Sequence, residues 1–137
     1  MRWLSLVLMA LLVASISACG SDEPLGTEAA IRAYFDAWNE RDVDLIMSHV
    51  APDAELEIEP VGVFWSDPGE IRHAFETMFA RSDWTVEVSD FEVDGDSATY
   101  NFVITYPDGA VAERGRSRAV VEDGLIKREE VVGAYRS

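Results

Sequence analysis

The apolar residues between positions 27 and 81 recur mostly with helical spacing. The first stripe follows an i, i+3, i+4, i+7 pattern, which predicts a helix with Thr27 as its N-cap. Asp42 can cap a second helix, and Pro52 is expected to end it. Asp67 and Pro68 are typical of the start of a third helix. The three apolar stripes are Ile31, Tyr34, Phe35 and Trp38; Val43, Ile46, Met47 and Val50; and Ile71, Ala74, Phe75, Met78 and Phe79.

Apolar and polar residues alternate elsewhere in the domain, as in strands with one buried face. In residues 55–59, Leu56 and Ile58 share the face expected to be buried, and three glutamates share the other. Four more alternating stretches lie between residues 84 and 135, separated by three turns that contain an Asp-Gly pair. A change of phase near Ser89 predicts a β-bulge. Turns this short join antiparallel neighbours, so the pattern predicts an α+β domain with three helices packed in a strongly curved antiparallel sheet.

The first nineteen residues have a different pattern: a basic residue, an apolar run and then small residues. Arg2 precedes the run, which ends at Ile16. These parts make a secretory signal that is too short for a comfortable transmembrane span. The residues Ile16-Ser17-Ala18-Cys19 resemble a bacterial lipobox. That resemblance implies cleavage before Cys19 and lipid on its sulfur and new amino group. The alternative is an ordinary signal peptide with an incidental cysteine.

These signals predict a chain of three parts. Residues 1–18 form a signal peptide, residues 19–26 a lipidated flexible tether, and residues 27–137 the folded domain. We therefore expect an exported bacterial lipoprotein, held at a membrane through Cys19 on the periplasmic or cell-surface side.

The composition narrows the possible functions. The chain is 48% hydrophobic and carries a net charge of −15, so it can bury a core and presents an acidic surface. Such a surface repels phosphate backbones, which argues against nucleic-acid binding. Cys19 is the only cysteine, so no intramolecular disulfide is possible. His49 and His73 stand alone without ligand spacing, so we expect no metal, and no motif calls for a cofactor.

Four short motifs, together with the order of the elements, indicate a family. They are Tyr34-Phe35-Asp36-Ala37-Trp38-Asn39, Arg41-Asp42-Val43-Asp44, Ala51-Pro52-Asp53-Ala54 and Glu122-Asp123-Gly124-Leu125-Ile126. With them the chain resembles the NTF2-like superfamily, and within it the SnoaL-like group, over about residues 27–135. The resemblance implies a cone, in which a bent sheet wraps around helices and leaves an apolar pocket in its mouth. The superfamily includes ketosteroid isomerase, polyketide cyclases and pure binding modules, so the fold alone implies no activity.

The resemblance to ketosteroid isomerase implies two catalytic positions. Tyr34 falls at the position of the tyrosine that stabilises an oxyanion, and Glu59 at that of the general base. The strand that should carry a third, acidic group has none in residues 114–119, so the isomerase site is incomplete. The alternative is structural: Glu59 is a solvated rim residue like Glu55 and Glu57, and Tyr34 is a core aromatic with a satisfied hydroxyl.

Three arginines form a basic cluster in this acidic chain. The period-two spacing of Arg114, Arg116 and Arg118 places them on one face of a strand. One hypothesis is an anion site for a carboxylated ligand. The commoner alternative is cross-strand pairing with Glu129, Glu130 and other acids.

The sequence leaves three functional hypotheses open. The preferred one is a domain that binds a small apolar ligand or a protein partner without turnover. The second is an enzyme that transfers a proton on a small hydrophobic substrate, with Glu59 as base and Tyr34 as donor. The third is an interaction module whose exposed sheet face forms a homodimer. The expected pocket residues are Trp38, Trp65, Phe75, Phe102 and Ser117.

Overall fold

The computed structural model describes residues 23–58 and 62–136. The elements within these residues occur in the order α1 (Thr27–Glu40), α2 (Val43–Ser48), β1 (Val50–Glu57), β2 (Phe64–Trp65), α3 (Pro68–Arg81), β3 (Thr85–Asp94), β4 (Ser97–Thr105), β5 (Val111–Glu122) and β6 (Leu125–Arg136). The predicted α+β class is confirmed. No helix among the described residues is long and apolar enough to cross a membrane.

The six strands of the described chain form one mixed sheet in the order β2-β1-β6-β5-β4-β3. Short turns join β3 to β6 into the predicted antiparallel meander. The prediction of a fully antiparallel sheet was wrong at one place, because β1 pairs in parallel with β6. Those two strands are far apart in sequence, so no short turn constrains their direction.

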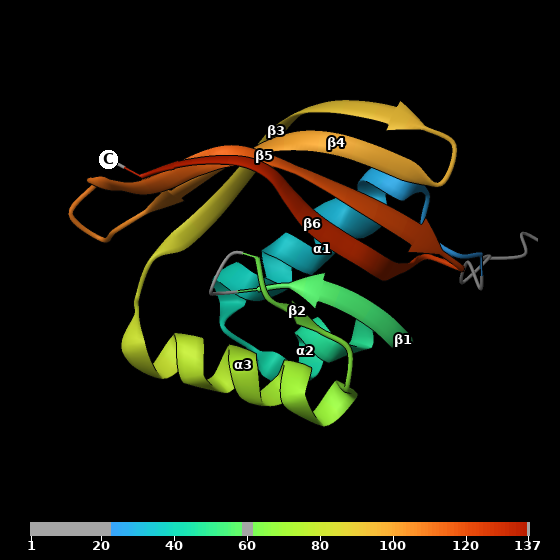
Figure 1. The fold of residues 1–137 in the computed structure, drawn as a ribbon, viewed down its shortest axis with the longest axis horizontal. Helices are drawn as coiled ribbons and strands as arrows, with labels where there is room; N and C mark the ends of the chain where they lie inside the picture. Colours follow the sequence, from blue (N-terminus) through green and yellow to red (C-terminus); the bar gives the residue numbers. More distant parts are fainter. Residues whose placement is uncertain (1–22, 59–61, 137) are drawn as a thin grey trace, which may run out of the picture.

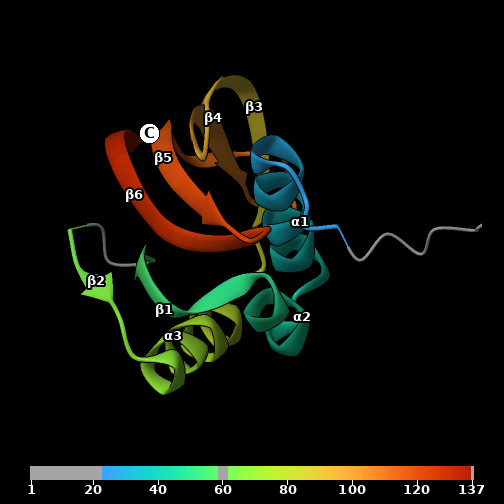
Figure 2. The same ribbon diagram turned by 90° about the vertical axis from the view of Figure 1, so that its right-hand side faces the viewer.

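Helix α1 lies on the concave side of the curved sheet, where it packs against β3, β4, β5 and β6. Figure 2 shows the strands curling around this helix, with α2 and α3 beside β1. The predicted stripe of α1 is buried: Ile31 and Tyr34 are fully covered, and Trp38 is 8% exposed. The helix therefore forms the centre of the core and one wall of any cavity on the concave side of the sheet.

The helix starts were predicted correctly in two of three cases. Asp42 and Asp67 each accept a hydrogen bond from a backbone N–H of the first turn, at 3.1 Å. Thr27 is not the N-cap of α1; Gly26 takes that position, and the Thr27 hydroxyl instead donates to the Gly95 carbonyl at 2.7 Å. Helix α2 also ends earlier than Pro52. At Pro52 the chain is already in β1, because the Ile126 N–H donates to the carbonyl of His49, the residue just before that strand.

The predicted bulge in β3 is confirmed. The pairing of β3 with β4 shifts register between Ser89 and Glu92, and Asp90 has a φ of 54°. The Asn101 side chain donates to the Asp90 carboxylate at 2.9 Å. The bulge turns the strand so that its first half follows the curvature over α1.

Asn39 joins the end of α1 to β3 by a paired contact. Its amide donates to the Val86 carbonyl at 2.8 Å and accepts from the Val86 N–H at 2.8 Å. We expect Asn39→Ala to lower the free energy of unfolding by about 1–2 kcal/mol, because two partly buried backbone groups lose their partner. Asn39→Asp keeps the acceptor for the Val86 N–H but places a carboxylate oxygen against the Val86 carbonyl, so it should also lose stability. Urea denaturation of both variants tests this; an Asn39→Asp variant as stable as the wild type would contradict the paired contact.

Candidate functional site

A cavity of about 250 Å³ lies between α1 and the concave face of the sheet. Its walls are mainly aromatic and aliphatic, with three glutamates and one serine as the exceptions. Among the described residues that line it, none is a lysine, arginine or histidine. The lining residues are Phe35, Trp38, Glu57, Ile58, Met78, Trp84, Val86, Phe102, Ile104, Tyr106, Ala112, Glu113, Ser117, Glu129 and Val131.

Glu129 is the buried acid of this cavity. Its side chain comes from β6, and the residue is only 4% exposed. The Tyr34 hydroxyl donates to Oε2 at 3.2 Å, and the Tyr100 hydroxyl donates to Oε1 at 3.4 Å. The pKa of Glu129 is raised from its usual 4.5 to about 8, mainly by burial; hydrogen bonds from the two tyrosines lower this pKa, and the nearby Glu57 adds a smaller increase. Near neutral pH the group is therefore mostly a neutral carboxylic acid.

The two tyrosines stand behind Glu129 and do not line the cavity. Both are fully buried, and their pKa values are raised, first by burial and then by the charge of Glu129. The Trp38 ring packs edge-on against Tyr34 with centroids 5.8 Å apart, and its indole N–H is buried without a hydrogen-bond partner. Tyr34 therefore acts on the cavity only through Glu129.

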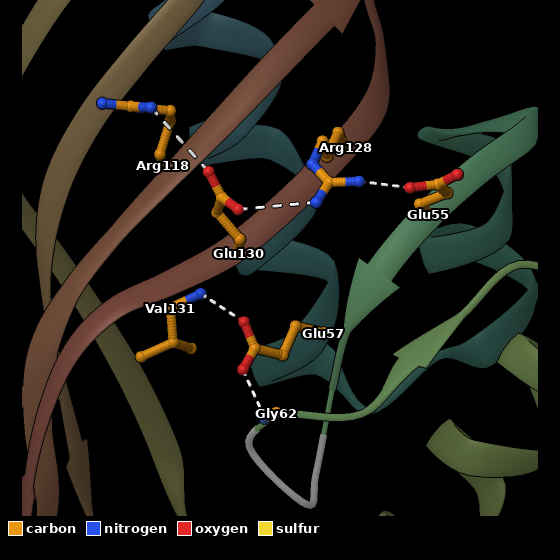
Figure 3. Close-up of polar contacts among 7 residues, drawn as sticks. All are labelled: Glu55, Glu57, Gly62, Arg118, Arg128, Glu130 and Val131. Atoms are coloured by element: carbon orange, nitrogen blue, oxygen red, sulfur yellow. Dashed lines mark hydrogen bonds and ion pairs between the residues drawn. The ribbon is translucent and has the colours of Figure 1, made fainter.

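Glu57 is the second buried acid, and its oxygens are already occupied. Figure 3 shows one oxygen accepting the Val131 N–H, at 2.7 Å, and the other accepting the Gly62 N–H. The prediction that Glu57 is a solvated rim residue was wrong, since it is 7% exposed. The parallel pairing of β1 with β6 ends at Leu56. At the next residue, the Glu57 side chain continues the contact with β6 by accepting the Val131 N–H. Glu57 thus holds the end of β1 in place.

The arginines lie on the other face of the sheet. Figure 3 shows a chain of ion pairs, in which Glu130 contacts Arg118 at 3.8 Å and Arg128 at 3.5 Å, and Arg128 also contacts Glu55. The predicted pairing with Glu130 is confirmed; pairing with Glu129 was wrong, because that residue points inward. Arg116 pairs with Glu92 at 2.9 Å. These pairs are solvent-exposed and contribute little stability each.

Among the described side chains, no arginine therefore brings positive charge into the cavity. Ser117, between Arg116 and Arg118 in sequence, and Ala119, directly after Arg118, are buried on the concave side. The hypothesis of an anion site at the three arginines is untested, but such a site would not lie in this cavity, because Arg116 and Arg118 pair with acids and none of the three lines it.

The expected pocket residues fall into two groups. Trp38, Phe102 and Ser117 line the cavity. Phe75 and Trp65 do not: Phe75 is fully buried and packs against Trp38 with ring centroids 5.1 Å apart, and Trp65 pairs with β1 and packs on the outside of the core.

Two predicted residues, Glu59 and Cys19, lie outside the described residues, and their roles stay predictions.

Sequence reasoning missed Glu129 and Tyr100. The third acidic group was sought on β5, whereas the neighbouring strand β6 supplies it directly opposite Ala119. The alternation of β6 gives no clear signal, because Ile126 and Glu129 are both buried three positions apart, across a register shift in the pairing with β5. No group of side chains suited to hold a metal ion occurs among the described residues, and His73 is exposed.

Comparison with known proteins agrees with this architecture. The family profile of the SnoaL-like domain matches residues 31–129, and the chain belongs to this family. The NTF2-like fold is confirmed by a Cytophaga hutchinsonii NTF2-like protein of unknown function, which is 11% identical with a TM-score of 0.64, covering 82% of this chain and 93% of that one. No curated protein matches the sequence.

Two other solved structures carry named ligands or activities. A candidate polyketide cyclase from Sinorhizobium meliloti is 26% identical over 74% of this chain and 92% of that chain, with a TM-score of 0.64. The Mycobacterium tuberculosis protein RV0760c was solved in complex with estradiol-17β-hemisuccinate. It is 17% identical, covers 77% of this chain and 92% of its own, and has a TM-score of 0.63, so this likeness shows the fold alone.

Proposed function

We propose that this SnoaL-like domain binds a small, largely apolar ligand with one hydrogen-bonding end and no negative charge. The observation that carries the proposal is the buried carboxyl of Glu129 in the wall of a cavity that is otherwise mainly aromatic and aliphatic. A pocket with apolar walls and a few convergent polar groups is the usual form of a ligand site. RV0760c, solved in complex with estradiol-17β-hemisuccinate, supports only the use of this fold to bind a small, largely apolar molecule, because that ligand also carries a carboxylate.

The chemistry of the walls defines the ligand class. Glu129 in its neutral form can donate its proton to a carbonyl or hydroxyl oxygen. Glu57 adds negative charge, and no described cation lines the cavity, so a carboxylated ligand would be buried without a counter-charge. The volume of about 250 Å³ is below the roughly 300–1,000 Å³ of drug-sized pockets, so the ligand should be small.

Two ligands that share a naphthalene ring and differ in the charge of their polar end test the proposed class. We expect 2-naphthol to bind at least about tenfold more tightly than 2-naphthoate at pH 7, because a buried carboxylate beside Glu57 has no partner. Ala112→Phe, which fills the cavity, should abolish 2-naphthol binding. Ala110→Phe is the matched control: it makes the same change at an exposed position outside the lining. Fluorescence titration measures both. Equal affinity for the two ligands, or binding that survives Ala112→Phe, would contradict the proposal.

A second candidate function is proton transfer on the bound ligand, and the pKa of Glu129 favours it. A group with a pKa of about 8 holds both protonation forms near neutrality, which suits general acid–base chemistry. Tyr34 and Tyr100 would then position the acid and would not touch the substrate. If turnover of a bound ketone occurs, Glu129→Gln should remove it and leave binding within a few-fold. Turnover that persists in this variant would exclude Glu129 as the acid or base.

We also propose that the domain is anchored to a membrane by lipid on Cys19, as the lipobox resemblance implies. Mass spectrometry of the protein from its own host should show a chain that begins at Cys19 and carries acyl groups. Cys19→Ser should release the protein from membranes. An unmodified cysteine in the mature chain would contradict the anchor and leave the ligand proposal intact.

A further inference from the structure

The residues that lead into α1 lie against the turn between β5 and β6. A Cβ added to Gly124, whose φ is +75°, would come within 2.8 Å of the Leu25 nitrogen and 3.1 Å of the Pro24 Cβ. The described part of the predicted tether is therefore seated on the domain. A side chain at Gly124 would displace it, so the glycine marks a close approach of two backbones.

A second contact fixes the start of α1 at the same end of the sheet. The Thr27 hydroxyl donates to the carbonyl of Gly95, in the turn between β3 and β4. The turns at Gly95 and Gly124, each with a left-handed glycine, thus both contact the entering chain. Figure 1 shows these turns and the entering chain together at one end of the molecule, on the right.

The cavity opens at the opposite end. Tyr106, which is 46% exposed and lines the cavity, follows the last residue of β4, and Ala112 lies at the start of β5. Figure 1 places the β4–β5 turn on the left, away from the entering chain. Strand β4 has nine residues, so at about 3.3 Å per residue the two ends are roughly 30 Å apart along the strand.

The length of chain before the seated segment is short. Cys19 is four residues before Glu23, the first described residue. A fully extended chain spans at most about 3.5 Å per residue, so the lipid is no more than roughly 14 Å from Glu23. The end of the sheet with the Gly95 and Gly124 turns must therefore stay close to the anchoring lipid.

This end is acidic, so the short tether, and not attraction to the lipid, would hold it near the membrane. Exposed acids flank both turns, and anionic headgroups would repel them. These residues are Asp94, Asp96, Glu122 and Asp123.

We infer that the anchored domain stands with its Gly95 and Gly124 turns toward the membrane and its cavity open to the aqueous side, so that it takes a water-borne ligand and not one dissolved in the bilayer. The inference rests on the proposed lipid anchor and ligand cavity.

Fluorescence quenching on vesicles tests the orientation. Two variants of the full lipidated chain, Asp96→Cys and Ala110→Cys, carry one free thiol each, because lipid blocks Cys19. Each is labelled with a fluorophore and placed on phosphatidylcholine vesicles that contain a nitroxide-headgroup lipid. The probe at position 96 should be quenched several-fold more strongly than the probe at position 110. Insertion of about 20 Gly and Ser residues after Gly20 should reduce this difference, because such a linker is a flexible coil.

The outcomes separate this inference from the anchor itself. Equal quenching at the two positions, or stronger quenching at position 110, on a chain that floats with the vesicles overturns the orientation alone. A wild-type chain that does not float with vesicles overturns the anchor and the orientation together. Undiminished contrast after the linker insertion would show that the domain surface, and not the short tether, sets the orientation, which also overturns the inference.

Discussion

Replacing Gly115 with alanine is expected to lower the free energy of unfolding by about 3 kcal/mol or more. An added Cβ would lie 2.1 Å from the Gly133 carbonyl oxygen and 2.8 Å from Cζ of Phe102. The carbonyl belongs to the backbone of β6, so β5 and β6 would have to separate, which costs more than the usual overpacking. Phe102 lines the cavity, so the same change should weaken ligand binding. Urea denaturation monitored by circular dichroism measures the loss of stability.

Gly133 provides the matched control for Gly115. It lies on the neighbouring strand in the same bend, but a Cβ there would meet nothing within 4 Å. Gly133→Ala should therefore change stability by no more than about 1 kcal/mol, and in the stabilising direction, because alanine restricts the unfolded chain. Similar denaturation midpoints for the two variants would show that the bend tolerates a side chain at either position.

The helices and the inward faces of most strands could be predicted from the sequence because burial repeats with the period of each element. The stripes of α1 and α3 place their largest residues in the core, including Tyr34 and Phe75. The short turns that contain Asp-Gly pairs correctly predicted that β3 to β6 form an antiparallel meander. Such signals are local, and each requires only residues within a few positions of one another.

The candidate site could not be predicted, because it depends on contacts between distant segments. Alternation assigned Glu57 to solvent, yet its side chain lines the cavity and accepts the Val131 N–H of β6, while the neighbouring Leu56 is fully buried as well. The partner of Tyr34 is 95 residues away in sequence, and only the register of β6 selects Glu129. The resemblance to ketosteroid isomerase directed attention to residues 114–119, one strand away from the acid.

Glu129 is expected to make the stability of the domain fall steeply as the pH rises. Its pKa is about 8 in the folded protein and 4.5 in the unfolded chain. Between these pH values the unfolded chain ionises Glu129 while the folded domain keeps the proton. The free energy of unfolding therefore falls by about 1.4 kcal/mol for each unit by which the pH rises. The contribution is fully present below pH 4.5, and about 4 kcal/mol of it is lost by pH 8.

Glu129→Gln isolates this contribution, because glutamine has nearly the same shape and does not ionise. At pH 4.5 the variant should be about 1 kcal/mol less stable than the wild type, since one tyrosine hydroxyl must turn to accept from the amide. At pH 8 the order should reverse, with the variant more stable by several kcal/mol. Urea denaturation of both proteins from pH 4.5 to 8.5 measures the difference.

Glu122→Gln is the matched control, because it removes the same carboxylate from an exposed position on β5. Its stability curve should run parallel to that of the wild type across the whole pH range. If Glu129→Gln also runs parallel, the carboxyl is ionised inside the fold at neutral pH. The cavity would then present a negative charge where a neutral donor is expected, and both the ligand class and the proton-transfer role of Glu129 would have to be abandoned.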